Sequence, residues 1–362
     1  MMFVYVGTFT GETGAQGISV YRMDGRSDVL THVQTVPGLL SPSFLALHPT
    51  RPFLYAVERQ LVADGAGVGA VAAFAIDEAS GMLTLLNRQA TGGVSPAHIS
   101  VHPGGRFVLA AHYGSGQVAV LAVEDDCSIG KVMDVVQHVG RGPNAGRQEG
   151  PHAHFVTPDP SGTFVLVCDL GIDRVMVYRL DTETGTLIPN DISYAQVGSG
   201  AGPRHLAFHP NGRHLYVINE LDSTIVAFHF DATRGACQIF QTVSTLPEGF
   251  HDVSHTAQIL VHPSGHFLYG SNRGHDSIVR FALDPATGRL SAPLFEPSGG
   301  KTPRNFAVDP SGTVLLAANQ DSGTIIRFRI AEHSGRLVPA GEPTRTPSPV
   351  CLVFATFGDQ QQ

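Results

Sequence analysis

The sequence of 362 residues predicts an all-β fold, namely a seven-bladed β-propeller with four antiparallel strands in each blade. Three observations support this expectation. One type of segment recurs along the whole chain at intervals of about 50 residues. Each copy contains short apolar runs separated by turns rich in Pro and Gly, without an amphipathic helix of useful length. The length of the chain divided by the interval gives about seven copies.

A proline next to a turn marks each complete repeat. An apolar run leads into the turn, a second run rich in Tyr, Val and Leu follows it, and an alternating run such as STIVAFHF comes after a polar break. A fourth strand is expected in segments such as ACQIFQTVSTL, so each repeat predicts one antiparallel blade. The sixth repeat in the alignment, from Gly150, has two extra residues, which we assign to its turn. The marker prolines are Pro49, Pro103, Pro160, Pro210, Pro263 and Pro310.

The seventh repeat is divided between the two ends of the chain. MFVYVGTFTG at the amino end matches the run after the turn, with Tyr5 in the place of Tyr55, and TPSPVCLVFAT at the carboxyl end matches the run before it. We therefore expect the terminal strands to share one blade, which closes the ring and removes open sheet edges. Residues 1–362 would then form a single propeller domain. The chain lacks Trp and the GH…WD signature, which argues against a WD-type propeller.

Composition excludes several classes of protein. The net charge of −8 is spread without basic blocks, so neither nucleic acid nor an anionic membrane surface is an expected partner. The amino end lacks the pattern of a signal peptide, and no apolar run approaches the ~18 residues of a membrane span, which predicts a cytoplasmic protein. Four scattered cysteines without a CxxC pair predict reduced thiols and no zinc site. We expect a monomer without a metal or other cofactor.

Many of the 18 histidines have a structural interpretation. Four repeats carry a histidine directly before the marker proline, and two carry Asp159 or Asp309 at the same position. A polar side chain there is expected to bond the backbone of the turn, and metal binding is not expected. The four histidines are His48, His102, His209 and His262.

Hairpin register predicts which side chains meet at the channel. In GPRHLAFHPNGRHLYVINEL the numbers of facing residues sum to about 423 to 424, which places Arg204 near Glu220. The first strand of every propeller blade lines the central channel, so the open ends of all these hairpins surround one rim. The other facing pairs are His152 with Leu170 and Ala257 with Arg273.

The rim residues suggest a pocket for an anion. Arginines and a histidine replace small residues at equivalent positions, and guanidinium groups suit carboxylate or phosphate oxygens. The alternative is an ordinary solvated loop surface. The candidate catalytic residues are His152, Arg204, Glu220 and Arg273. The candidate substrate-binding residues are Arg304, His154, His205, Asn272, Asn319, Gln320, His112 and Glu58.

The strings GPRHLAFHPNGRHLYVINELDSTIVAFHF and LVHPSGHFLYGSNRGHDSIVRFALD resemble the seven-bladed lactonase family. That family includes bacterial 6-phosphogluconolactonase of the propeller type and fungal 3-carboxy-cis,cis-muconate cyclase. The resemblance implies that the histidine after a GP pair, the arginine of GPRH, the glutamate of NEL and the arginine of NRG are active. These motifs fall on His152, Arg204, Glu220 and Arg273, and Arg304 of TPRNF would assist anion binding. His154 lies two residues further along the same strand face.

The function implied is hydrolysis of a sugar lactone that bears phosphate or carboxylate, most simply 6-phosphogluconolactone of the pentose phosphate pathway. We assign general acid and general base to Glu220 and His152 in either order, with a depressed pKa for Glu220 beside Arg204. Arg204 and Arg273 would stabilise the oxyanion. Three alternatives stay open: a lactonizing cyclase, a lactonase for an unphosphorylated lactone, and a non-catalytic binding platform similar to YVTN-type repeat proteins. Insertions at 61–69 and 142–150 are expected to overhang the pocket.

Overall fold

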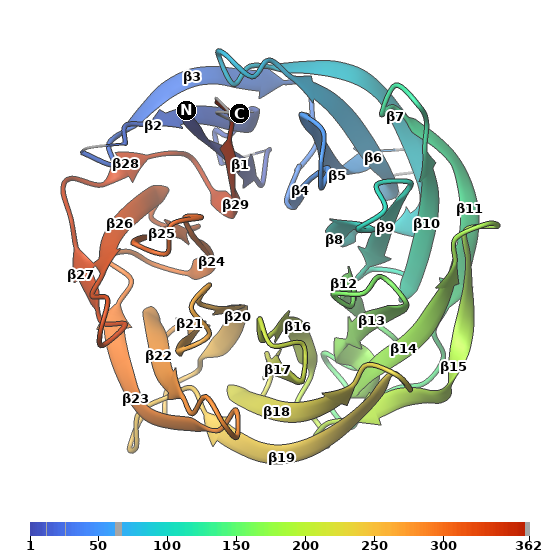
Figure 1. The fold of residues 1–362 in the computed structure, drawn as a ribbon, viewed down its shortest axis with the longest axis vertical. Coiled ribbons are helices and arrows are strands. Elements are labelled where there is room, and N and C mark those ends of the chain that lie inside the picture. Colours follow the sequence, from blue (N-terminus) through green and yellow to red (C-terminus); the bar gives the residue numbers. More distant parts are fainter. Residues whose placement is uncertain (12, 26, 62–66, 359–362) are drawn as a thin grey trace.

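The computed structural model describes residues 1–358 except 12, 26 and 62–66. It confirms the seven-bladed β-propeller: seven antiparallel sheets stand around a central axis, each with one edge strand facing that axis (Figure 1). The seventh sheet has a short fifth strand, β28, which pairs with β26. Within the described ranges the only helical element is a 3-10 turn, η1 (Leu170–Ile172). None of the described segments forms a helix long and apolar enough to cross a membrane.

The blades are numbered from the amino end, and their strands are given from the axis outward. Blade 1 contains β29 (Pro349–Thr356), β1 (Met2–Thr8), β2 (Gly17–Met23) and β3 (Leu30–Pro37). Blade 2 contains β4 (Leu45–Leu47), β5 (Phe53–Leu61), β6 (Gly67–Ile76) and β7 (Leu83–Val94). Blade 3 contains β8 (Pro96–Val101), β9 (Phe107–His112), β10 (Gln117–Val123) and β11 (Ile129–Gln137). Blade 4 contains β12 (Ala153–Pro158), β13 (Phe164–Asp169), β14 (Arg174–Asp181) and β15 (Thr186–Gln196).

The remaining three blades repeat the same order. Blade 5 contains β16 (Pro203–Phe208), β17 (His214–Asn219), β18 (Thr224–Asp231) and β19 (Ala236–Ser244). Blade 6 contains β20 (His255–Val261), β21 (Phe267–Arg273), β22 (Ser277–Leu283) and β23 (Leu290–Pro297). Blade 7 contains β24 (Pro303–Val308), β25 (Val314–Asn319), β26 (Thr324–Ile330), β27 (Leu337–Pro339) and β28 (Thr344–Arg345).

The two ends of the chain close the ring, as the divided repeat predicted. Strand β29 pairs with β1 in antiparallel register from Met2 opposite Thr356 to Gly7 opposite Cys351. In Figure 1 the N and C labels accordingly lie side by side. This pairing gives blade 1 its innermost strand, so every blade presents an equivalent strand to the channel.

Buried tyrosines join neighbouring blades. Tyr5 and Tyr55, which the repeat alignment treats as equivalent, are both fully buried, as are Tyr216 and Tyr269. Each hydroxyl donates to a backbone carbonyl in a turn of the next blade, so burial of the ring leaves no polar atom unpaired. The acceptors, in the same order, are Gly81, Cys127, Gly288 and Gly335, at 3.0, 3.1, 2.8 and 2.7 Å.

The histidines before the marker prolines bond the turns, which confirms their structural interpretation. Nδ1 of His209 accepts the backbone N–H of Asn211 at 3.0 Å, and Nε2 donates to the carbonyl of Gly265 in the next blade at 2.9 Å. His102 and His262 make the corresponding contacts. Both nitrogens are therefore occupied, and these side chains hold turns and blades together.

The prediction for the two extra residues of one repeat is wrong. The extra residues of the repeat from Gly150 do not lie at its turn, because Asp159 and Pro160 form the same turn as His209 and Pro210. In both, the residue before the proline accepts the N–H of a glycine three positions on, at 2.9 Å. The two extra residues precede β12 instead. Consequently His154, and not His152, occupies the position of Arg204 in its blade.

Bulges explain how this position reaches the channel. In five blades the ladder between the first two strands shifts register at one residue of the inner strand, and a bulge of this kind redirects a side chain. Glu220 therefore donates its backbone N–H to Gly202, and in blade 6 a wider shift places His255 opposite Arg273, where Ala257 was expected. The predicted proximity of His152 to Leu170 is confirmed by a 3.0 Å backbone bond. The five bulged residues are Ala97, His154, Arg204, Arg304 and Val350.

Candidate active site

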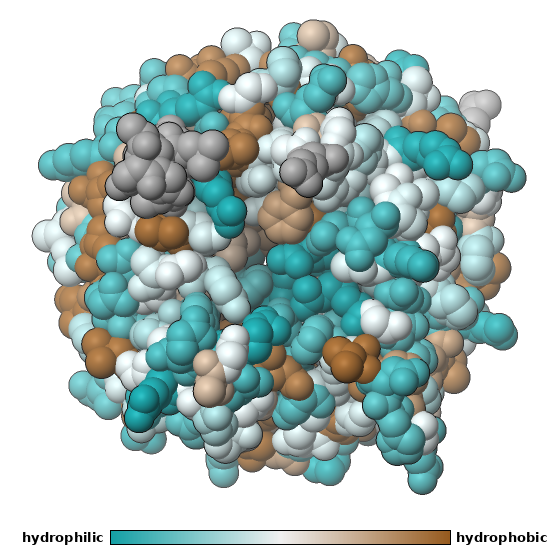
Figure 2. Space-filling view, turned by 180° about the vertical axis from the view of Figure 1, so that it is seen from behind, coloured by the Kyte–Doolittle hydropathy of each residue, from teal (hydrophilic) through white to brown (hydrophobic). Residues whose placement is uncertain are grey.

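A cavity of about 370 Å³ lies at one mouth of the channel. All five bulged residues line it, so the bulges supply part of its wall. On the face drawn in Figure 2, hydrophilic side chains gather beside the hollow near the centre of the ring. Six of the side chains that the sequence predicted for this site line the cavity: His154, Arg204, His205, Glu220, Arg273 and Arg304.

The other six predicted residues do not line the cavity, and each of them bonds to another protein group instead. Asn272 and Asn319 are fully buried and donate their amides to backbone carbonyls at 2.8 and 3.0 Å. Their shared place at the end of the second strand thus reflects a bond that closes the loop. Three other predicted residues form hydrogen bonds or an ion pair away from the cavity: His112 with Thr91, Gln320 with Asp321, and Glu58 with Arg88.

His152 is the sixth of these residues, and it lies behind Tyr113. The two rings are stacked with centroids 4.4 Å apart, and Nδ1 of His152 donates to the backbone carbonyl of Tyr113 at 2.7 Å. Nε2 lies 3.2 Å from a carboxylate oxygen of Glu149. Both ring nitrogens are therefore engaged, whereas Tyr113 itself lines the cavity.

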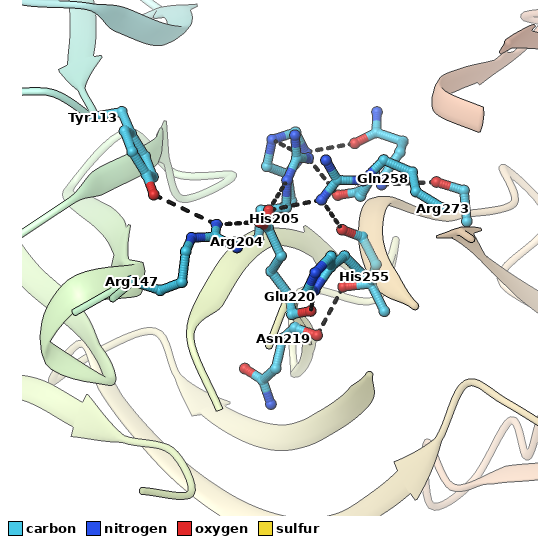
Figure 3. Close-up of polar contacts among 12 residues, drawn as sticks. Tyr113, Arg147, Arg204, His205, Asn219, Glu220, His255, Gln258 and Arg273 are labelled. Carbon is cyan, nitrogen blue, oxygen red and sulfur yellow. Dashed lines mark hydrogen bonds and ion pairs between the residues drawn. The ribbon is translucent and has the colours of Figure 1, made fainter. Parts of the chain in front are cut away.

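Glu220 is the centre of the ionic contacts, and three arginines converge on it (Figure 3). Nη2 of Arg147 lies 2.5 Å from Oε1, while Nε of Arg204 and Nη2 of Arg273 lie 2.8 and 2.9 Å from Oε2. These groups come from three different blades or the loops between them. The carboxylate therefore fixes the relative positions of three guanidinium groups at the channel mouth.

Arg147 is a site residue that the sequence reasoning did not name. It belongs to the segment 142–150, which was expected to overhang the pocket and which does contribute this side chain to the cavity wall. The neighbouring Gln148 anchors the segment: it is fully buried, and its amide donates to Leu170 and Asp173 at 2.8 and 2.7 Å. No repeat position corresponds to Arg147, so alignment of the repeats could not find it. The segment 61–69 was also expected to overhang the pocket, but most of it lies outside the described residues.

The electrostatics of Glu220 follow from these contacts. Burial alone would raise the pKa of its carboxyl, but the guanidinium groups of Arg273, Arg204 and Arg147 outweigh burial and hold the pKa well below its usual range. The group is thus ionised at neutral pH. A carboxylate that weakly basic, with both oxygens already accepting hydrogen bonds, is a poor acceptor for a further proton.

Arg204 and His205 are locked by mutual contacts. Nη1 of Arg204 donates to the carbonyl of Ala257 at 2.6 Å and to Nε2 of His205 at 3.1 Å. Because Nε2 accepts, Nδ1 of His205 carries the proton, and it donates to Oε1 of Gln258 at 2.6 Å. His205 therefore holds Arg204 in place and has no ring nitrogen left to accept a proton.

His154 differs from the other imidazoles of the channel mouth. It lines the cavity, and its buried Nδ1 has no hydrogen-bond partner. Burial, followed by the positive charges of Arg204, Arg304 and Arg273, holds its pKa well below the usual value of a histidine. The ring is therefore neutral at physiological pH and able to accept a proton. Within the described part of the chain, no three His, Cys, Asp or Glu side chains are grouped so as to hold a metal ion.

Comparison with known proteins identifies the family. The model of the lactonase family with a seven-bladed β-propeller matches residues 3–354. The chain belongs to this family. The match spans nearly the whole sequence, so the earlier resemblance, the fold and the assignment to lactonases agree.

Several members of this lactonase family are similar over most of their length. The 6-phosphogluconolactonase of Bacillus subtilis is 38% identical over 84% of each chain, and that of Formosa agariphila is 33% identical over 84% of this chain and 86% of the other. Among solved structures, a periplasmic gluconolactonase of Pseudomonas aeruginosa superposes with a TM-score of 0.92 at 30% identity, covering 99% and 100% of the two chains.

Proposed function

We propose that this lactonase hydrolyses 6-phosphoglucono-δ-lactone with His154 as the general base. The observation that carries the proposal is a neutral imidazole whose Nδ1 has no hydrogen-bond partner, in a residue that lines a cavity with five arginines. The names of two relatives favour the phosphorylated sugar lactone. The Pseudomonas relative is named for the unphosphorylated lactone and as periplasmic, so that lactone is a competing substrate, and the cytoplasmic location of this chain stays a prediction.

The reaction divides among these residues as follows. His154 accepts a proton from water as the water oxygen bonds to the lactone carbonyl carbon. The oxyanion that forms is stabilised by the guanidinium groups of Arg273, whose Nε is buried without a partner, and Arg204. When the bond between this carbon and the ring oxygen breaks, the imidazolium of His154 returns the proton to the ring oxygen. The product is the open hydroxy acid, and Glu220 takes no proton in either step.

Substrate binding would improve the base. Positive charges of Arg204, Arg304 and Arg273 lower the pKa of His154, after the larger effect of burial. An anionic substrate beside these arginines cancels part of that charge and raises the pKa of His154 towards neutrality. Proton transfer is then better matched to physiological pH in the complex than in the free enzyme.

Direct turnover tests the proposed substrate. Initial rates are measured on freshly generated 6-phosphoglucono-δ-lactone, glucono-δ-lactone and a muconolactone, each corrected for spontaneous opening. We expect the phosphorylated lactone to have the highest kcat/KM, because it brings negative charge to a cavity with an excess of arginines. Background rates on all three lactones would contradict the proposed function.

A further inference from the structure

The five arginines that line the cavity fall into two groups. Arg147, Arg204 and Arg273 share the carboxylate of Glu220, which is the only acidic side chain among the described residues that line the cavity. Arg59 and Arg304 line the same cavity, and neither has a carboxylate within ion-pair distance in the described part of the structure. Among the described residues, no carboxylate therefore neutralises these two guanidinium charges by contact.

The side chain of Arg304 is held without an ionic partner. Its guanidinium group lies 5.0 Å from the centre of the Phe9 ring, a cation–π contact that supports the charge but leaves its N–H groups available. Burial, then the positive charge of Arg273, lowers the pKa of Arg304 to about 10, so the group is still charged at neutral pH. Asp321 influences it only from outside the cavity, where its Oδ2 accepts the hydroxyl of Thr302.

Arg59 stands at the other end of the same wall. Its Nη2 donates to Oγ of Ser95 at 2.5 Å, and its backbone N–H donates to Leu40 at 2.8 Å. Two bonds between Thr10 and Ser41, at 2.9 and 3.3 Å, join this end of the wall to the segment that carries Phe9. The wall thus runs continuously from Arg304 to Arg59.

Most of this wall lies across the ring from Glu220, while the charges of Arg273 and Glu220 still act on Arg304. Arg304 belongs to blade 7 and Arg59 to blade 2, with Phe9 of blade 1 between them, whereas Glu220 follows β17 of blade 5. In a ring of seven, blade 5 lies opposite blades 1 and 2 (Figure 1). The hydroxyls of Ser41, Ser43 and Ser95 also line the cavity and add donors on the side of the wall.

We infer that Arg59 and Arg304, with the hydroxyls between them, form a phosphate subsite that selects phosphorylated sugar lactones over unphosphorylated ones. The inference rests on the proposed lactonase function and assigns two parts of the cavity to two parts of the substrate. The phosphate lies against the wall, and the lactone carbonyl lies beside His154 and the arginines that pair with Glu220. A phosphate dianion matches two guanidinium groups that have no carboxylate partner among the described residues, and each can donate two N–H groups to its oxygens. A carboxylate would neutralise one of them.

The test compares two substrates in the same variants. We would measure kcat/KM for 6-phosphoglucono-δ-lactone and glucono-δ-lactone with wild type, Arg59→Gln and Arg304→Gln. Loss of one charged pair predicts that the preference for the phosphorylated lactone falls roughly 10- to 100-fold in each variant. Arg174→Gln is the matched control, because Arg174 lies on an outer strand against Tyr194 and its loss changes the net charge equally. The control is expected to keep the wild-type preference.

Binding of inorganic phosphate, measured by calorimetry at low salt, separates this inference from the proposed function. Wild type is expected to bind phosphate at least tenfold more tightly than Arg59→Gln or Arg304→Gln, while circular dichroism shows all three folded. If wild type hydrolyses neither lactone but phosphate binding follows this order, the function fails and the subsite stands. Equal losses on both lactones, or phosphate binding equal to wild type in both variants, would overturn the subsite.

Discussion

Replacing His154 with asparagine is expected to lower kcat/KM for the lactone by about 100- to 10,000-fold, the range for removal of a general base. Asparagine fits the space of the imidazole but accepts no proton at neutral pH. The fold should tolerate the change, because Nδ1 of His154 makes no hydrogen bond that would be lost. Steady-state rates on 6-phosphoglucono-δ-lactone, with unfolding by urea beside them, measure both effects.

His152→Asn is the matched control for this prediction. His152 lies on the same stretch of chain but behind Tyr113, with both nitrogens bonded to protein groups. Its replacement is expected to cost at least tenfold less activity than His154→Asn. A larger loss in His152→Asn would return the catalytic role to His152, as the resemblance to the family motif implied, and would contradict our proposal for His154.

Glu220→Gln is expected to lower both stability and activity. Removal of one partner from a buried ionic cluster leaves guanidinium groups without a counter-charge, which costs about 3–5 kcal/mol in the free energy of unfolding. Arg204 and Arg273 would then repel each other and lose the geometry that stabilises the oxyanion, so kcat is expected to fall about 100- to 1,000-fold. Glu58→Gln is the matched control, because Glu58 is similarly buried but pairs with one half-exposed arginine, Arg88, outside the cavity.

The loss of stability in Glu220→Gln should depend on pH in one direction. The pKa of Glu220 is lower in the folded protein than in the unfolded chain, where it is about 4.3. The carboxylate therefore contributes its full stabilisation above about pH 5. This stabilisation is lost as the pH falls below the pKa that Glu220 has in the unfolded chain. The difference in unfolding free energy between wild type and Glu220→Gln should shrink between pH 5 and pH 3. Equal stability losses in Glu220→Gln and Glu58→Gln at pH 7 would contradict the account of the ionic cluster.

The fold could be predicted from sequence because it is repetitive. The apolar runs, turn prolines and divided repeat all follow from strand burial and ring closure, which act alike in every blade. The site was only partly predictable. Register arithmetic assumes an uninterrupted ladder, and a bulge beside Arg204 breaks that assumption. Counting six residues back from the marker proline reaches Arg204, Arg304 and His154 in their repeats, so the sequence does contain a signal for these positions. Placing the two extra residues at the turn hides this signal for His154.

Other site residues depend on contacts that no repeat encodes. Arg147 reaches Glu220 from a segment with no counterpart in the other blades, and its position depends on the anchoring of Gln148. Conversely, Asn272 and Asn319 occupy rim positions by number, but their amides turn inward to close backbone loops. Side-chain direction at a strand end is set by local hydrogen bonds, which spacing alone does not specify.

The pH dependence of lactone hydrolysis tests the central claim most directly, since a neutral imidazole in an arginine-rich cavity must titrate in a defined way. Rates of 6-phosphoglucono-δ-lactone opening would be measured from pH 4 to pH 7.5, with correction for spontaneous opening. We predict that kcat/KM falls towards acid pH with one apparent pKa below 6.5. The corresponding fall in kcat should occur at higher pH, because bound substrate offsets the charges of the arginines. His154→Asn should abolish both of these pH-dependent decreases. A profile that keeps the same acid limb in His154→Asn would show that another group is the base.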